Sequence, residues 1–215
     1  MSHTKRQFAV LVVALVALAV LILWFAWSTG KLGNSQPQHD LQAAGIVALK
    51  TPRALPDLSF QTSENTELRT QEMQNHWYLI YFGYTYCPDI CPTSLAEMRQ
   101  IHRLLTPEAQ QQVRFTMLTV DPERDTAEQL RAYLNFFHPD FLALSVSMAN
   151  IQSVIASLAI PVMPGDTEKA VYTFFHSGNL AIISPDGKHF GFVQAPFKIQ
   201  SVAEQFNRLV QSTAP

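Results

Sequence analysis

The strongest constraint on this chain is an apolar run that leads into a pair of cysteines, Cys87 and Cys91, the two that the sequence contains. Residues 77 to 82 carry aromatic and aliphatic side chains without a charge, a pattern that predicts a strand buried on both faces of a sheet. A glycine ends the run, and a proline, which suits the first turn of a helix, follows each cysteine. The cysteines are therefore predicted to lie between the end of a strand and the start of a helix.

The free N–H groups at a helix start stabilise a thiolate relative to a thiol. We therefore expect both cysteines to deprotonate easily and to be reactive. Residues four apart on a helix have Cβ atoms roughly 5 to 6 Å apart, whereas a relaxed disulfide needs roughly 3.8 Å, so a bridging metal fits better. Pro88 can draw Cys87 out of the helix, so a redox-active disulfide between Cys87 and Cys91 can also form. A purely structural disulfide explains the pair less well, because so small a ring removes little chain entropy.

The segment FGYTYCPDICPTSL at 82 to 95 resembles the Sco/SenC family, copper-binding thioredoxin-like proteins that help assemble the copper centre of cytochrome c oxidase. The resemblance continues over roughly residues 55 to 212, through DPERDT at 121 to 126, His176 with the serine after it, and SPDG at 184 to 187. It implies that one copper ion, Cu(I) or Cu(II), is bound by Cys87, Cys91 and His176. Two thiolates and an imidazole favour copper over hard cations such as magnesium, but zinc could also bind to these ligands.

Residues around the implied site carry further expectations. The family usually has an aspartate before the histidine, and Phe175 stands there in this chain, so a hydrogen bond that could tune the imidazole is expected to be missing. Met163 is expected to fill the core rather than bind copper. Asp121, Arg124 and Asp125 are expected to form a charged network near the site or a surface for a partner.

No function is assigned to four histidines expected beside turns or on polar helix faces: His76, His102, His138 and His189.

Residues 8 to 27, FAVLVVALVALAVLILWFAW, form an uncharged run whose helix would span about 30 Å, one hydrocarbon core. A buried core helix would show a polar stripe, and a cleaved signal peptide has a shorter apolar region, so we expect an uncleaved transmembrane helix. Lys5 and Arg6 precede the run, which predicts a cytoplasmic segment at 1 to 7 and a domain on the periplasmic side of a bacterial inner membrane. The segment is too short for a mitochondrial presequence.

Residues 28 to 54 are polar and contain glycine and proline without periodicity, which predicts a linker to a domain at 55 to 215. Strands and helices alternate in that domain, which predicts an α/β fold with a mixed central sheet and flanking helices. The family resemblance narrows this to a thioredoxin-like fold. Strands are expected near 58–60, 67–69, 77–82, 113–120, 141–146, 171–175, 180–184 and 190–193, and helices at 92–105, 148–159 and 198–211, with another from a Thr126–Gln129 capping box to before Pro139.

Charge excludes one class of function. Outside residues 1 to 27 the chain holds 13 basic and 17 acidic residues, a formal charge of -4, so it offers no basic stripe for nucleic acid.

The resemblance implies a copper chaperone for cytochrome c oxidase subunit II, with other periplasmic copper chaperones or thiol reductants as further partners. The alternative is a thiol-disulfide oxidoreductase that reduces the cysteines of that subunit or of another periplasmic protein, with Cys87 attacking and Cys91 resolving. His176 discriminates between the two, because thiol exchange needs no third ligand. A peroxide-reducing thiol enzyme is a weaker reading, because the chain lacks an obvious peroxidatic signature.

Overall fold

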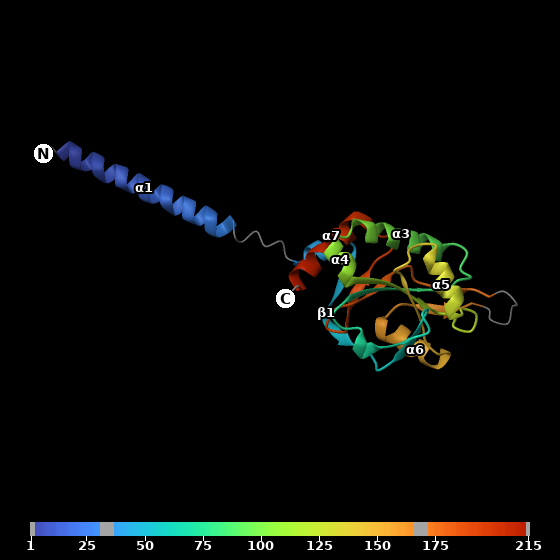
Figure 1. Ribbon diagram of the computed structural model, residues 1–215. Helices are drawn as coiled ribbons and strands as arrows, with labels where there is room; N and C mark the ends of the chain where they lie inside the picture. Colours follow the sequence, from blue (N-terminus) through green and yellow to red (C-terminus); the bar gives the residue numbers. More distant parts are fainter. Residues whose placement is uncertain (1–2, 31–36, 166–171, 214–215) are drawn as a thin grey trace. The chain divides into compact units, whose positions relative to one another are not determined.

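The computed structural model describes residues 3–30, 37–165 and 172–213. Part of the predicted linker, 31 to 36, and the first residue of the strand predicted near 171–175 lie outside them. The chain divides into two compact units, Met1–His39 and Asp40–Pro215. In the first, helix α1 (His3–Gly30) includes the whole uncharged run (Figure 1). Among the described residues, no helix reaches the length and apolar character that crossing a membrane requires.

The second unit is built on a mixed sheet of eight strands in the order β1-β10-β9-β4-β5-β6-β2-β3, with a separate pair of strands, β7 and β8. The strands are β1 (Ile46–Ala54), β2 (Ser59–Thr62), β3 (Glu67–Arg69), β4 (Trp77–Gly83), β5 (Val113–Thr119), β6 (Leu142–Ser145), β7 (Val162–Pro164), β8 (Phe174–His176), β9 (Leu180–Ile183) and β10 (Lys188–Val193). The mixed sheet confirms the predicted fold class.

Strand β4 lies in the middle of the sheet, and all of its residues are buried, as its uncharged sequence predicts. It runs parallel to β5 and antiparallel to β9. Gly83 and Thr119, the last residues of β4 and β5, are paired across the ladder. The two segments that follow, with Cys87 and Asp121, therefore leave the sheet at the same edge, where sites of open α/β sheets form.

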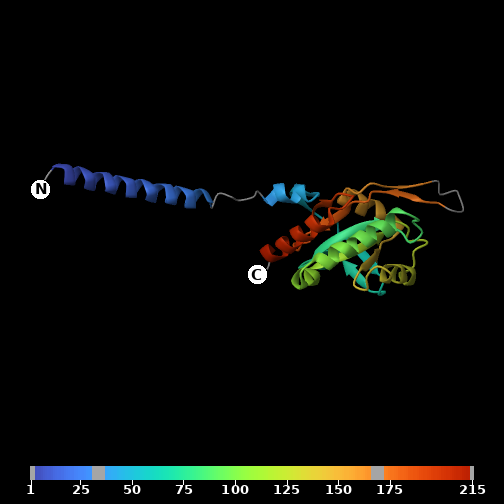
Figure 2. The same cartoon turned by 90° about the horizontal axis from the view of Figure 1, so that it is seen from above.

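Helices cover both faces of this sheet: α3, α4 and α7 gather on one side and α6 on the other (Figure 1). Both views show α3 and α7 side by side (Figures 1 and 2). The predicted capping box of Thr126 and Gln129 is present at the start of α5. The helices are α2 (Pro37–Ala43), α3 (Ile90–Leu104), α4 (Pro107–Gln112), α5 (Ala127–Asn135), α6 (Met148–Leu158) and α7 (Ile199–Thr213), with one 3-10 turn at Thr70–Glu72.

The sheet reaches further toward the N-terminus than the sequence suggested. Strand β1 lies within the predicted linker at 28 to 54, and it pairs with β10 at one edge of the sheet. Only its first residues are apolar and packed, whereas the half that holds Lys50, Pro52 and Arg53 is exposed and irregularly paired. Because buried and exposed residues do not alternate along β1, the sequence shows no strand periodicity there. The opposite edge is β3, a short strand with an ion pair between Glu67 and Arg69.

Candidate metal centre

The two cysteines lie where the strand-to-helix prediction put them. Cys87 is in the loop after β4, outside helix α3, and its N–H donates to the Tyr84 carbonyl at 3.2 Å. Cys91 is in the first turn of α3 and is fully buried, while Cys87 is 8% exposed. Both are free thiols. The loop conformation, rather than helical spacing, therefore sets how far apart the sulfurs lie.

His176 completes the group predicted from the family resemblance. Its Nε2 lies 3.4 Å from Cys91 Sγ and 3.8 Å from Cys87 Sγ, and the ligand atoms of the three residues all lie within 4.8 Å of one another. The Tyr81 and Tyr84 rings contact the imidazole edge to face, with centroids 5.7 and 5.9 Å away. Two sulfurs and one nitrogen thus face a common point.

The other ring nitrogen of His176 fixes the orientation of the imidazole. Nδ1 lies 3.4 Å from the backbone carbonyl of Ser177, which can only accept a hydrogen bond. With a metal bound, we therefore assign the proton to Nδ1, which leaves the lone pair of Nε2 for the ion; without a metal, Nε2 carries a proton when it donates to Cys87. Histidine ligands of metals are commonly held in this way by a carbonyl or a carboxylate.

The two sulfurs differ in acidity. A hydrogen bond from Cys91 is the main cause that lowers the pKa of Cys87 to about 3; burial opposes it, and hydrogen bonds from His176 and nearby backbone N–H groups assist. The same hydrogen bond, followed by burial, raises the pKa of Cys91. The prediction that both thiols deprotonate easily is therefore wrong for Cys91. A second negative charge beside the first would be costly in a buried pair.

The DPERDT segment holds the cysteine loop in place through Asp125. This buried carboxylate accepts hydrogen bonds from the Thr85 N–H and from the hydroxyls of Thr85, at 2.5 Å, and Thr119, at 2.6 Å. Burial raises the pKa of Asp125, and these hydrogen bonds oppose the rise. Thr85 precedes Cys87 by two residues, so Asp125 ties the cysteine loop to the end of β5.

The same segment holds the histidine side through Arg124. Its guanidinium pairs with buried Asp121, lies 3.7 Å from the centroid of the Tyr172 ring, and donates to the Tyr172 carbonyl at 3.2 Å. The Tyr172 hydroxyl in turn donates to Asp121 at 3.1 Å. We call these three residues the Arg124 clasp. The expected charged network is therefore present, and since Asp121 and Asp125 are buried, they support the site rather than form a surface.

Phe175 and Met163 lie on the outer face of the β7–β8 hairpin. They are directly opposite each other across the strands and are 66% and 61% exposed. Val162 and His176 form the neighbouring pair, and alternation along a strand places their side chains on the inner face. Met163 is therefore neither in the core nor a ligand. With Phe175 turned outward, His176 Nδ1 instead donates its hydrogen bond to the Ser177 carbonyl.

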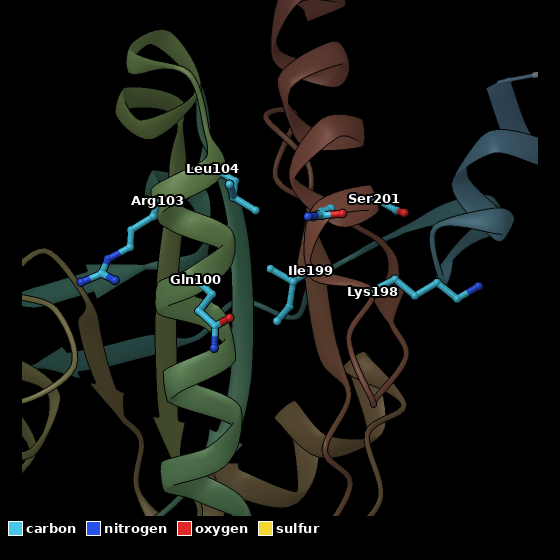
Figure 3. Close-up of a pocket in the computed structure, with 7 residues that line it drawn as sticks. Gln100, Arg103, Leu104, Lys198, Ile199 and Ser201 are labelled. Atoms are coloured by element: carbon cyan, nitrogen blue, oxygen red, sulfur yellow. The ribbon is translucent and has the colours of Figure 1, made fainter.

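A groove of about 590 Å³ lies elsewhere, between α3 and the start of α7 (Figure 3). Arg103, Leu104 and Ile199 are among its lining residues, which include no thiol or imidazole. The residues that sequence reasoning missed are Tyr84, Thr85 and Tyr172. The motif around Cys87 contains two of them, but their contacts span long separations along the chain, and no local pattern signals such contacts.

The spacing of the donor atoms suits a soft metal ion. Sulfur and nitrogen ligands lie about 2.3 and 2.0 Å from a bound zinc ion, which places them roughly 3.5 Å apart in tetrahedral geometry. The separations of 3.4 and 3.8 Å from His176 Nε2 to the two sulfurs are close to this value. Thiolate and imidazole suit Cu(I) and Zn²⁺ and disfavour magnesium or calcium. Three ligands leave one side of the ion open to exchange.

Known proteins share both sequence and fold with this chain. The sequence model of the SCO1/SenC family matches residues 50–211. A candidate copper-binding protein of Stutzerimonas stutzeri is 35% identical over 162 residues, which cover 75% of this chain and 79% of that protein. The mitochondrial SCO1 homolog 1 of Arabidopsis thaliana is 28% identical over 171 residues, 80% of this chain, but the match spans only 50% of that relative.

A solved structure gives the same result. Bradyrhizobium japonicum ScoI with copper bound is 28% identical, with a TM-score of 0.65, and the match covers 72% of this chain and 98% of that one. The mixed α/β fold described above is thus the thioredoxin-like fold of the Sco structures, as predicted. Because the family model extends over most of the sequence and the fold agrees, the chain belongs to the SCO1/SenC family.

Proposed function

We propose that this chain is a membrane-anchored copper chaperone that carries one copper ion to the copper centre of cytochrome c oxidase subunit II. The observation that carries the proposal is the convergence of Cys87, Cys91 and His176, whose ligand atoms lie within 4.8 Å of one another. Two relatives add support: the Stutzerimonas stutzeri protein through its name, and Bradyrhizobium japonicum ScoI through its copper-bound structure.

Unequal burial of the ligands suits a carrier. Cys91 is fully buried, whereas Cys87 is 8% exposed and His176 is only partly buried. An incoming thiolate of the acceptor therefore approaches from the side of Cys87 and His176. Copper bound to three ligands can accept that thiolate before it loses one of its own, so the ion passes on without becoming uncoordinated.

A second function, thiol-disulfide exchange, is favoured by the different acidity of the two sulfurs. The lowered pKa of Cys87 makes it the attacking thiolate. It would attack a disulfide of the substrate, forming a mixed disulfide and releasing one substrate thiolate. Cys91 would then attack the Cys87 sulfur, releasing the second thiolate and leaving a Cys87–Cys91 disulfide. The substrate gains two electrons, and a periplasmic thiol reductant must restore the pair.

A complementation experiment separates the two functions. Cells that lack the gene receive the wild-type chain, His176→Ala, Cys87→Ser or Cys91→Ser, and oxidase activity is measured at limiting copper. A chaperone requires all three ligands, so each variant should fail, and added copper should rescue His176→Ala only in part. His76→Ala, a histidine outside the site, is the control and should restore activity. Full rescue by His176→Ala at low copper, with failure of both cysteine variants, would replace the chaperone by the reductase.

The location is a further part of the proposal. The uncharged run at 8 to 27 and the cations before it support an anchor in the bacterial inner membrane with the domain in the periplasm. Such a chain should stay in the membrane fraction after alkaline carbonate extraction, and protease added to spheroplasts should digest its domain. A mature protein that begins near Thr29 and is found free in the periplasm would contradict the anchor.

A further inference from the structure

A second group of possible ligands lies far along helix α3 from the cysteines. His102 is in the last turn of α3, and His138 and Asp140 lie between α5 and β6. From Cys91 to His102 the helix rises by about 16 Å, so the two groups are separate. The expectation that His102 lies on a polar helix face is wrong, because it is buried against Phe115.

The side chains of this group face one another closely enough to share an ion. The ligand atoms of His102, His138 and Asp140 all lie within 4.8 Å of one another, and the two imidazole centroids are 4.2 Å apart. His138 Nδ1 is 3.9 Å from Asp140 Oδ2. Ligands of a tetrahedral zinc ion lie roughly 3.3 Å apart. The Asp140 side chain is 81% exposed, so it can close the remaining gap at little cost.

Hydrogen bonding engages one ring nitrogen of this group. The backbone N–H of Asp140 donates to His138 Nδ1 at 3.2 Å, so a metal ion bound to His138 replaces that hydrogen bond. The His102 side chain is 9% exposed, and its ring faces His138 and Phe115.

A hollow beside the cluster gives an ion a route in. His102 and Asp140 line a cavity of about 260 Å³ together with Gln110, Phe115 and Phe141. Burial, and then the neighbouring His138, lower the pKa of His102. The ring is thus held neutral, which is the form that coordinates metals.

We propose that His102, His138 and Asp140 form a second metal site, which binds a divalent first-row ion such as Zn²⁺ through two imidazoles and one carboxylate. Nitrogen and oxygen ligands suit such an ion and distinguish this site from the sulfur site. Water completes the coordination on the side of the cavity. The proposal does not depend on the copper function, because none of its ligands takes part in the sulfur site.

The test is a calorimetric titration with Zn²⁺. The full chain carries Cys87→Ser, Cys91→Ser and His176→Ala, which together remove the first site. One Zn²⁺ should bind per chain and raise the melting temperature. Adding His138→Phe should weaken binding by about 100-fold or more. Phenylalanine keeps the ring contact with Phe141 and loses the hydrogen bond from the Asp140 N–H, so the melting temperature without zinc should fall only slightly.

Two further variants make the result specific. Asp140→Asn keeps the size of the side chain and removes its charge, so zinc affinity should fall by about tenfold. Asp186→Asn alters another exposed aspartate, one paired with Lys188, and should leave zinc affinity unchanged. Absence of zinc binding in the parent triple variant, or equal affinity in His138→Phe, would overturn the proposal. The histidines would then be part of an aromatic cluster with Phe115 and Phe141.

Discussion

The cysteine side and the histidine side of the metal centre are built differently. Cys87 and Cys91 follow β4, which is buried along its length and paired on both sides within the main sheet. His176 lies on β8, a strand of three residues that pairs with β7 in a sheet of two strands. The core therefore fixes the positions of the two cysteine ligands. The position of His176 depends on a small hairpin, which side chains such as that of Arg124 hold to the rest of the domain.

One segment compensates for that difference. Asp125 bonds to the cysteine loop at Thr85, and Arg124 bonds to the hairpin at Tyr172, so adjacent residues set the positions of both sides. Tight binding of a soft metal requires that the ligands on the cysteine side and on the histidine side are both correctly positioned. We infer that loss of a cysteine ligand should abolish copper binding, whereas changes on the hairpin should weaken it in steps.

The largest effect is expected from the cysteines. Cys87→Ser or Cys91→Ser should nearly abolish copper binding by the reduced chain, because a hydroxyl replaces a soft thiolate. Equilibrium dialysis gives the stoichiometry, and the thiolate-to-copper absorption band of the Cu(II) form should be strong in the wild-type chain and lost in these variants. If zinc is retained while copper is rejected in competition, the copper assignment fails.

Removal of the third ligand should have a smaller effect. His176→Ala should weaken copper binding by about 100-fold or more and leave the Cys87–Cys91 pair able to exchange thiols. The His176 hydrogen bond contributes to the lowered pKa of Cys87, so the pH profile of exchange should move upward in this variant. Copper binding of wild-type strength in His176→Ala would show that the hairpin supplies no ligand.

A single methyl group at the end of β4 tests how tightly the cysteine side is packed. A Cβ at Gly83 would lie 3.1 Å from Cys91 Sγ and 2.8 Å from a Tyr81 ring carbon. Gly83→Ala should therefore displace the sulfur, lower copper affinity by tens of fold, and cost about 1–3 kcal/mol of stability. Leu79→Ala, in the same strand, is the control, because it should destabilise by about 2–5 kcal/mol with little change in copper affinity.

Loss of the Arg124 clasp should loosen the hairpin alone. Arg124→Ala should lower copper affinity by about tenfold in the wild-type chain and have no further effect once His176 is already alanine. Arg131→Ala is the matched control, since Arg131 also donates to a backbone carbonyl, that of Ser63. Equal losses in both His176 backgrounds would show that the clasp acts through the cysteine side or through general stability.

The smallest effect concerns the sheet rather than the site. His189 on β10 lies beside the turn at 185–187, as expected, but it is fully buried, and burial lowers its pKa. Below about pH 6.5 the unfolded chain takes up a proton that folded His189 does not, so the free energy of unfolding falls as the pH drops toward the folded-state pKa. The slope is at most about 1.4 kcal/mol per pH unit, and urea unfolding of His189→Gln should show a shallower one. An unchanged slope would contradict this assignment.

Sequence reasoning predicted the parts of the site that rest on local chemistry. The uncharged run before Cys87 predicted β4, and the Thr126 cap predicted the start of α5, because each pattern involves neighbouring residues. His176 came from the family resemblance. Contacts such as Arg124 to Tyr172 and Thr85 to Asp125 join residues 48 and 40 positions apart, so no local pattern reveals them. The raised pKa of Cys91 likewise depends on the folded arrangement of the pair.

The edges of the main sheet bear on how this chain meets other proteins. Exposed edge strands invite strand addition from another chain, which leads to aggregation. Here β1 interrupts its edge with Pro52 and the charges of Lys50 and Arg53, and β3 is short and carries the Glu67–Arg69 pair. Neither edge offers a long row of free backbone donors. Under the proposed chaperone function, association with an acceptor would therefore rely on side chains around the metal centre rather than on backbone pairing, and the contact could end once the copper ion has moved.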